Sequence, residues 1–350
     1  MHQGVLYAFM AAALFGASTP FAKLLIGQVP PVMLAGLLYL GSGLGLSVWY
    51  GVRRLQAHDK QAGTGHLVAA DLPWLGAAIV SGGIAGPMLL MFGLAQTPAS
   101  TASLLLNMEG VMTALLAWFI FKENYDRRIV LGMLAIILAG VLLSWQQMPE
   151  FGVPWGPLAI VAACLCWAID NNLTRRISAS DAVQIASIKG LVAGSVNLGL
   201  ALMLGAQLPG LQKIMAAGLI GFCGYGVSLV LFVLALRHLG SARTGAYFSI
   251  APFVGAAISL LLLNDTVGLL FWLAAALMAV GIWLHLTERH EHPHTHQELA
   301  HTHSHRHDQH HQHEHDFEWD GSEPHTHQHR HLPITHSHAH YPDIHHQHSH

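Results

Sequence analysis

Charged side chains are scarce in this chain. Asp, Glu, Lys and Arg make up 10% of its 350 residues and apolar residues make up 53%, whereas a soluble protein has about 25% charged residues. So little charge excludes an ordinary soluble domain and predicts an integral membrane protein whose partner is the lipid bilayer. The formal net charge of −3 points to no further partner class, and no nucleic acid is expected among the partners.

Cysteine is also rare. Cys164, Cys166 and Cys223 all lie within apolar segments, so they predict no disulfide framework. Cys164 and Cys166 are two positions apart and face different sides of a helix, which favours packing over metal binding. The residues Met1–Gln3 contain no Lys or Arg, and no cleavage site follows them, so the first apolar segment is not expected to be a signal peptide.

Long apolar runs dominate the first 287 residues. A transmembrane helix needs about 20 mostly apolar residues to cross a hydrocarbon core of about 30 Å. Ten runs of suitable length are separated by polar residues or by Pro and Gly, and each predicts a membrane-spanning helix of an all-α protein. The ten runs are 4–26, 32–52, 72–94, 99–121, 127–147, 155–177, 183–205, 211–236, 241–263 and 267–287.

Basic residues near the ends of these spans predict the orientation, because cytoplasmic loops are rich in Lys and Arg. With the N-terminus in the cytoplasm, eleven basic residues lie at inner ends and only Lys23 and Lys213 lie at outer ends. Ten spans return the C-terminus to the cytoplasm, in a bacterial-type inner (plasma) membrane. Lys23 is expected to snorkel to the outer surface. The eleven inner residues are Arg53, Arg54, Lys60, Lys122, Arg127, Arg128, Arg175, Arg176, Arg237, Arg243 and Arg289.

The spans indicate a duplication into halves 1–147 and 148–288. Residues 76–123 align without gaps on residues 218–265, and both copies end an apolar helix on a carboxylate. Each half has five spans, and five is odd, so the second half is expected to enter the membrane upside down. Inverted repeats are typical of secondary transporters, with a substrate site near the middle of the membrane. Two close-packing spacings recur in the halves: Gly41 with Gly45, and Gly190 with Gly194.

Three stretches of the chain are distinctive: WAIDNN at 167–172, LRHLGSARTGAY at 236–247 and APF at 251–253. They resemble the EamA-type permeases of the drug/metabolite transporter superfamily, and the resemblance extends over residues 4–287. It implies two inverted five-helix halves with both termini in the cytoplasm. It also implies a central cavity lined mainly by the first, third, fourth, sixth, eighth and ninth helices.

The resemblance further implies alternating access without ATP, and the chain contains no phosphate-binding loop of the form G-x-x-x-x-G-K-[ST]. One position departs from the family pattern. Many relatives have a proline in the fourth helix, matching Pro252 in the ninth, whereas this chain has Glu109 and Gly110 there. The identity of the substrate is therefore not inferred from relatives.

Glu109 is the sharpest candidate for a functional residue. It lies about ten residues from either end of the span 99–121, with Asn107 close by. Because charge is costly in hydrocarbon, an ionisable residue near the bilayer centre is a site hypothesis by default. Glu109 is predicted to bind a cationic or amine group of the substrate, or to carry a proton. The alternative is a protonated or hydrogen-bonded carboxyl group that only holds helices together.

Asp170 and Lys189 form a second candidate group. They lie about five and six residues from the inner ends of neighbouring antiparallel spans, so at about 1.5 Å per residue both are roughly 8–9 Å deep. Their matching depth predicts an ion pair or a near contact, with a structural or a gating role. Snorkelling of Lys189 is the alternative. Asn171 follows Asp170 and is predicted either to bridge helices or to line the inner mouth.

Two aromatic residues and a glycine-rich segment complete the candidates within the membrane. Trp167 and Tyr247 are predicted to line the substrate cavity, with packing or an interfacial position as the alternative. The run Gly82–Pro87 predicts an unwound segment whose freed backbone groups face protein or water. This segment is either a hinge for alternating access or a close-packing face.

The C-terminal residues 289–350 differ from the rest of the chain. Residues 290–350 contain 23 of the 28 histidines, and a composition this polar predicts disorder. Neutral imidazole binds Zn, Ni, Co and Cu, so the tail is expected to bind transition metal ions, although the membrane part requires no cofactor. A proton buffer or pH sensor is the alternative. The candidate metal ligands are His292, His294, His296, His301, His303, His305, His307, His311, His313, His315, His325, His327, His329, His331, His336, His338 and His340.

Three functions fit these features, and none of them is enzymatic. The first is a secondary transporter of a small metabolite whose tail binds or senses a transition metal. The second is an efflux or uptake carrier for Ni, Co, Zn or Cu, although His285 is the only histidine within the predicted spans. The third is a non-transporting metal sensor or store. A homodimer is left open as an assembly.

Overall fold

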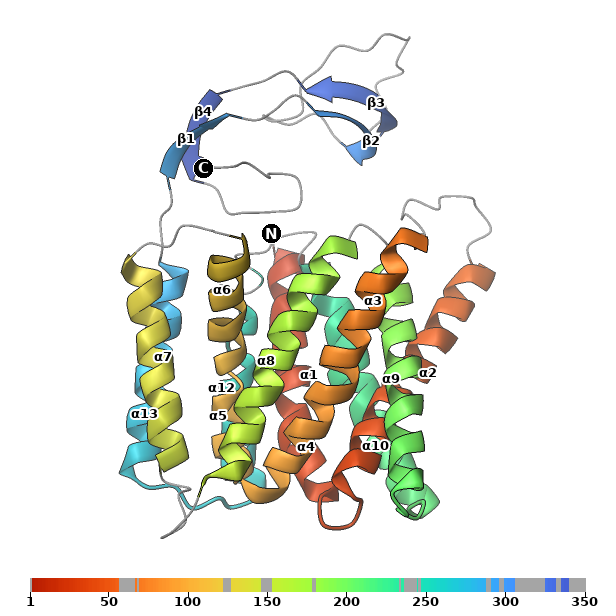
Figure 1. Cartoon of the computed structure of the whole chain (residues 1–350), viewed down its shortest axis with the longest axis vertical. Coiled ribbons are helices and arrows are strands. Elements are labelled where there is room, and N and C mark those ends of the chain that lie inside the picture. Colours follow the sequence, from red (N-terminus) through yellow and green to blue (C-terminus); the bar gives the residue numbers. More distant parts are fainter. Residues whose placement is uncertain are drawn as a thin grey trace. The chain divides into compact units, whose positions relative to one another are not determined.

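Helices account for most of the chain up to Leu286 in the computed structural model (Figure 1). The chain divides into two units, of which the first extends to Glu288 and the second contains the residues from Arg289 onward. The structure describes residues 2–56, 67, 69–121, 127–145, 153–177, 181–232, 234–235, 244, 247–287, 291–295, 299–305, 325–331 and 335–339.

The first half of the helical unit ends at Trp145. Its apolar helices pair their backbone N–H and C=O groups internally, as lipid requires. Pro31 is the first residue of α2, where a missing N–H is tolerated. The elements are α1 (His2–Leu25), α2 (Pro31–Gln56), η1 (Ala69–Asp71), α3 (Leu72–Ala78), η2 (Ile79–Ala85), α4 (Gly86–Gln96), α5 (Ala99–Leu105), α6 (Met108–Phe121) and α7 (Arg127–Trp145).

The second half begins with α8. The side chain of Asp181 precedes α9 and accepts a hydrogen bond from the Val183 N–H at 2.8 Å, which satisfies one of the free donors of the first turn. The elements of this half are α8 (Trp155–Ile177), α9 (Ala182–Met203), α10 (Leu211–Gly221), η3 (Phe222–Val227), α12 (Ala251–Leu262) and α13 (Leu269–Leu286).

Six helical stretches of the described residues are long and apolar enough to cross a membrane, and three shorter ones are apolar. The chain is therefore a multi-pass helical membrane protein. The predicted span 155–177 coincides with α8, and 72–94 corresponds to Leu72–Gln96. The span 99–121 is not one continuous helix, because a turn at Leu106 and Asn107 separates α5 from α6.

Each half contains a π-helical segment. In η2 the Gly86 N–H donates to the Ser81 carbonyl, an i to i−5 bond, and η3 ends on a bond of the same kind. The two segments coincide when Gly76 is aligned on Gly218. The expectation of an unwound segment at Gly82–Pro87 is corrected, because the helix widens there and stays continuous from α3 to α4.

Helix packing links the two halves in matching pairs (Figure 1). Two contacts join helices at the same position in each half, α2 with α9 and α7 with α13, and α5 packs on α12, which belong to the corresponding spans 99–121 and 241–263. Other contacts come in corresponding sets. The contact of α4 with α8 corresponds to the contact of α10 and η3 with α1. The contact of η2 with α9 corresponds to the contact of η3 with α2.

Glycines allow the closest of these contacts. A Cβ atom added at Gly41 would lie 2.2 Å from the Gly218 carbonyl oxygen, and one added at Gly190 would lie 2.6 Å from the Gly43 nitrogen. A Cβ at Gly194 would meet Leu40 at 2.5 Å. The predicted close-packing role of these glycines is confirmed, and van der Waals packing replaces the hydrophobic drive that lipid does not supply.

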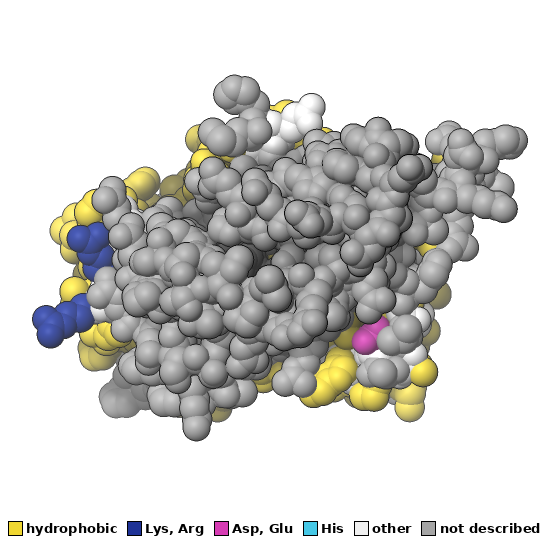
Figure 2. All heavy atoms as spheres, turned by 90° about the horizontal axis from the view of Figure 1, so that it is seen from above, with side chains coloured by type: hydrophobic (Ala, Val, Ile, Leu, Met, Phe, Trp, Pro, Cys, Tyr) yellow, Lys and Arg dark blue, Asp and Glu magenta, His cyan; other side chains and the backbone are white. Residues whose placement is uncertain are grey.

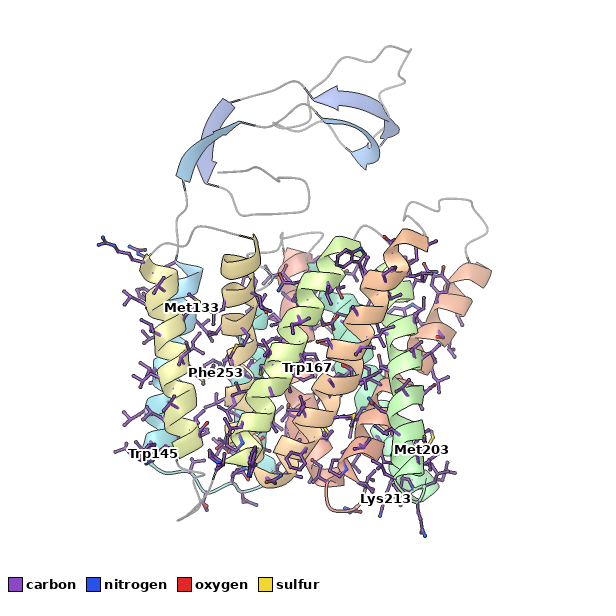
Figure 3. The ribbon with its side chains drawn as sticks, in the orientation of Figure 1. Met133, Trp145, Trp167, Met203, Lys213 and Phe253 are labelled. Carbon is purple, nitrogen blue, oxygen red and sulfur yellow. The ribbon has the colours of Figure 1, made fainter. Side chains whose placement is uncertain are left out.

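Many large apolar side chains are exposed on the helical unit, and some of them show at the margin of Figure 2. Exposed tryptophans lie near both ends of the helices, where aromatic rings match the membrane interfaces. Trp145, Met203 and Lys213 lie at one end of the unit (Figure 3). The exposed tryptophans are Trp49, Trp74, Trp145, Trp155, Trp272 and Trp283.

The second unit contains four short strands, so the expectation of a tail without regular structure is corrected for these residues. β1 (Glu291–Thr295) pairs with β4 (Thr335–Ala339), and β2 (Leu299–His305) pairs with β3 (His325–His331), both antiparallel. The physical reason is the period of the sequence. Histidines recur at every second position in each strand, and a strand alternates its side chains with the same period.

Candidate functional site

Glu109 lies in the first turn of α6, directly after the break between α5 and α6. Its Oε1 accepts a hydrogen bond of 2.7 Å from Nδ2 of Asn171 on α8, 62 positions further along the chain. Glu109 is half-buried and Asn171 is exposed. The N-terminal end of a helix favours a negative charge, so the break within the predicted span 99–121 presents an anion-stabilising helix end to a carboxylate.

Asp170 and Lys189 form the predicted ion pair between α8 and α9. The Lys189 Nζ lies 2.6 Å from Oδ1 and 2.7 Å from Oδ2 of Asp170. Thr174, one turn further along α8, donates to the same Oδ1 at 2.8 Å. Both charged side chains are only 10–13% exposed, so each depends on the other for compensation of its charge.

The carbonyl group of Gly82, in η2, accepts two side-chain hydrogen bonds. One is from the Tyr39 hydroxyl group and the other from Nε1 of Trp167, each at 2.9 Å. Pro87 explains this arrangement, because the next i to i−5 bond of the π-helix would need an N–H at that position. Nδ2 of Asn197 donates to the adjacent Gly83 carbonyl at 3.1 Å. The freed backbone groups thus face protein, as expected for a chain in lipid.

Aromatic rings surround Phe15 of α1. Its ring centroid lies 6.4 Å from Trp167, 6.0 Å from Tyr225 and 5.4 Å from Phe248. Tyr39 extends this cluster, with its ring 5.5 Å from Tyr225. Trp167 lies midway along α8 (Figure 3). The cluster therefore occupies the middle of the helical unit, where α1, α2, α8 and η3 meet.

The predicted residues thus fall into separate groups. Asn171 lies one turn from Trp167 on the same side of α8, so the Glu109 pair adjoins the aromatic cluster. Asn107 is buried elsewhere, where Nδ2 donates to the Leu104 carbonyl at 3.1 Å and to Sδ of Met278 at 3.6 Å. Tyr247 packs its ring 5.1 Å from Phe9.

The comparisons with known proteins agree with this fold. Residues 2–145 and 154–287 each match the EamA-like transporter family. The chain belongs to the EamA-like transporter family. It is therefore a membrane transporter of the drug/metabolite transporter type, and each half carries one copy of the family unit.

Proteins similar to this EamA-like transporter occur in Methanothermobacter thermautotrophicus and Escherichia coli. It is 27% identical over 297 residues to an "Uncharacterized transporter" of Methanothermobacter thermautotrophicus (strain Delta H), covering 80% of this chain and 85% of that protein. It is 24% identical over 285 residues to the "Uncharacterized inner membrane transporter YedA" of Escherichia coli (strain K12), covering 79% and 88%. A solved structure titled "Crystal structure of protein" matches its fold with a TM-score of 0.60 at 17% identity, covering 80% of this chain and 94% of that one.

Several residues that the structure brings into prominent contacts could not be identified as important from the sequence. Tyr39 and Phe15 are aromatic residues in apolar helices, and nothing in their local pattern separates them from packing residues. Lys23 does not snorkel, because Nζ donates to the Leu94 carbonyl and, at 2.8 Å, to the Thr97 carbonyl. In the sequence, Asp265 stands out only as the carboxylate at the end of the aligned segment 218–265.

The predicted metal ligands all lie in the tail, where the structure describes only the residues of the four strands. Where side chains are described, no group of three or more His, Cys, Asp or Glu could hold a metal ion. Along β2, the backbone register places His301, His303 and His305 opposite His329, His327 and His325. The candidates His296, His307, His311, His313, His315 and His340 lie outside the described residues.

Proposed function

We propose that this protein is a secondary transporter that moves a small metabolite by alternating access without ATP, and that it has no enzymatic activity. The proposal rests on the family and on one observation, the half-buried carboxylate of Glu109 at a helix break within the membrane.

The proposal includes ten spans in two inverted halves, 1–147 and 148–288, with both termini in the cytoplasm of a bacterial-type inner membrane. The matching helix contacts and the coinciding π-helical segments support two equivalent halves. The opposite directions of α1 and α8, and of α2 and α9, support their inversion (Figures 1 and 3). In such transporters the substrate binds between the halves near the middle of the membrane.

Charge complementarity favours an amine or a proton at Glu109. Asn171 is neutral, and among the described side chains no Lys or Arg lies within ion-pair distance of Glu109. The charge of Asp170 is balanced by Lys189. Glu109 is therefore the carboxylate that a cationic group of the substrate, or a transported proton, would neutralise.

Neighbouring residues complete the proposed site. Asn171 orients the carboxyl group of Glu109, and Trp167, whose ring packs against Phe15, lies one turn away on α8. Asp170 directly precedes Asn171 on α8. Its ion pair with Lys189 of α9 either supports the site or gates it. Asn107 and Tyr247 stay predictions as contacts along the substrate path.

Replacing Glu109 tests this function. A metabolite and metal susceptibility screen on a strain lacking the gene first identifies the solute, and flux is then measured in proteoliposomes. We expect Glu109→Gln to reduce flux at least about tenfold, because a charged hydrogen bond contributes about 1.5–3 kcal/mol, and Asn171→Ala to reduce it less.

The matched control is Asn172→Ala. Asn172 is the next residue of α8, and among the described residues its Nδ2 donates to the Ala168 carbonyl of its own helix at 2.8 Å. This variant should leave flux unchanged. Unchanged flux and unchanged pH dependence in Glu109→Gln would remove the proposed site.

The tail is proposed to bind or sense a transition metal, Zn, Ni, Co or Cu, rather than to form part of the transport path. The facing histidines of β2 and β3 support this proposal, because opposite residues of an antiparallel pair lie close together. Deleting residues 290–350 should leave metabolite transport intact and abolish its response to metal.

Metal transport is the second candidate function, and the tail is the observation that favours it. A metal carrier predicts that cellular Ni, Co, Zn or Cu changes when the gene is deleted. Constant metal levels would exclude it. A purified protein that moves no solute under any gradient would instead favour a metal sensor or store.

A further inference from the structure

The link between α4 and α5, at Thr97 and Pro98, is held from two sides. On one side Lys23 of α1 donates to the carbonyl groups of Leu94 and Thr97, at the C-terminal end of α4. On the other side Oδ2 of Asp265 accepts from the N–H and the hydroxyl group of Ser100, at 3.0 and 2.8 Å, in the first turn of α5.

Helix electrostatics explain why these two charges lie there. A cation is favoured at the C-terminal end of a helix and an anion at the N-terminal end, so Lys23 complements α4 and Asp265 complements α5. Asn264 adopts the left-handed conformation, with φ of 50°, and so ends α12 in a turn directly before Asp265.

Most side chains that follow this link are buried. Thr97 is 1% exposed, Ser100 0% and Thr101 3%, and a Cβ added at Gly156 of α8 would lie 2.5 Å from the Thr97 hydroxyl oxygen. All residues of α5 are buried. Beyond the helix break, by contrast, Glu109 is half-buried and its partner on α8 is exposed.

We propose that Lys23 and Asp265 form a latch that closes the transport path at the Thr97–Pro98 link in this conformation, and that opening this side requires its release. The inference rests on the proposed alternating-access function. The bond from Ser100 to Asp265 joins the two halves of the chain, 165 positions apart. A movement of one half against the other would therefore break it.

Accessibility of a buried cysteine tests the latch. Ser103 is 1% exposed and lies one turn deeper than Ser100, against Gly255 of α12, so Ser103→Cys is a nearly isosteric reporter. A membrane-impermeant maleimide is applied to intact cells and, separately, to inverted membrane vesicles. The same variants without the reporter give the labelling of the three native cysteines.

We expect Lys23→Met with Asp265→Asn to raise the labelling rate of the reporter at least about tenfold from one side, because two charged contacts hold the closed state. Ser100→Ala keeps both charges and removes one bond, so it should give a smaller increase. Lys213→Met is the matched control, because the Lys213 side chain has no hydrogen bond or ion pair to the other described residues. It should leave labelling unchanged.

The latch is overturned if reporter labelling in the Ser100→Ala and double variants equals that of the parent while all elute as folded protein in size-exclusion chromatography. The labelling requires no substrate, so it is independent of the flux measurement. Normal flux with unchanged labelling rejects the latch alone. If no variant shows flux but labelling increases, the proposed transport function is rejected, whereas the closure of the Thr97–Pro98 link by Lys23 and Asp265 is supported.

Discussion

Asp170 and Lys189 pair across the connection between α8 and α9, with the Lys189 Nζ 2.6 Å from Oδ1 of Asp170. Gly82 of η2 lies directly against the other carboxylate oxygen of Asp170. A Cβ added at Gly82 would lie 2.1 Å from Oδ2. The ion pair therefore joins three elements, α8, α9 and the π-helical segment, next to the Gly82 carbonyl group that Trp167 and Tyr39 hold.

Breaking the ion pair should destabilise the protein. Asp170→Asn and Lys189→Met each leave one buried charge without its partner, which costs about 3–5 kcal/mol. The double variant leaves no unpaired charge and should recover part of this loss, with a coupling energy of about 0.5–3 kcal/mol. Thermal unfolding in detergent micelles measures all three variants. Additive losses would show that the two side chains do not stabilise the fold as a pair.

Gly82→Ala should be destabilising because the added methyl group has no space. Its Cβ would overlap Oδ2 and, at 2.4 Å, Cγ of Asp170, and overpacking of this kind costs about 1–3 kcal/mol. Gly76→Ala is the matched control on the same helical stretch, since nothing lies within 4 Å of its Cβ. There alanine should be neutral or stabilise by up to about 1 kcal/mol. Equal melting temperatures of the two variants would contradict the close contact with Asp170.

Removing both donors to the Gly82 carbonyl should cost more than the sum of the single removals. Tyr39→Phe and Trp167→Phe each delete one hydrogen bond of 2.9 Å, at about 0.5–1.5 kcal/mol. In the double variant the carbonyl is also left without a partner inside the membrane, which adds about 1–3 kcal/mol to the sum of the two single losses.

A rescue variant makes this prediction specific to the π-helical segment. Pro87→Ala restores a backbone N–H at the position from which an i to i−5 bond would reach Gly82. Combined with the double variant, it should recover part of the lost stability, as measured by the melting temperature in the same detergent. A further decrease would instead assign Pro87 a packing role and contradict the missing-donor explanation.

The depth of a residue in the membrane could be predicted from the sequence, but the direction of its side chain could not. Span ends and the rise per residue place Asp170 and Lys189 at one depth, and their pairing is confirmed. The partner of Glu109 depends on how α6 and α8 are rotated about their axes, which apolar sequences leave open because lipid accepts any apolar face. For the same reason Asn107 and Glu109, two positions apart, face different neighbours.

Removing the tail should remove metal binding. With about four ligands per ion, the full-length protein should bind roughly five Zn²⁺ or Ni²⁺ ions, and a protein ending at Glu288 should bind none, as equilibrium dialysis with elemental analysis measures. Binding should weaken below about pH 6, because protonated imidazole is not a ligand.

The strand register makes a sharper comparison between two full-length variants. Replacing His301, His303 and His305 of β2 by Gln removes residues that face three histidines of β3. Replacing His311, His313 and His315 by Gln removes as many imidazole groups from outside the described strands. Because the register already places these histidines opposite those of β3, we expect the first variant to lose more of the tightest sites than the second. Equal losses in both variants would show that the histidines act by number and not by strand pairing.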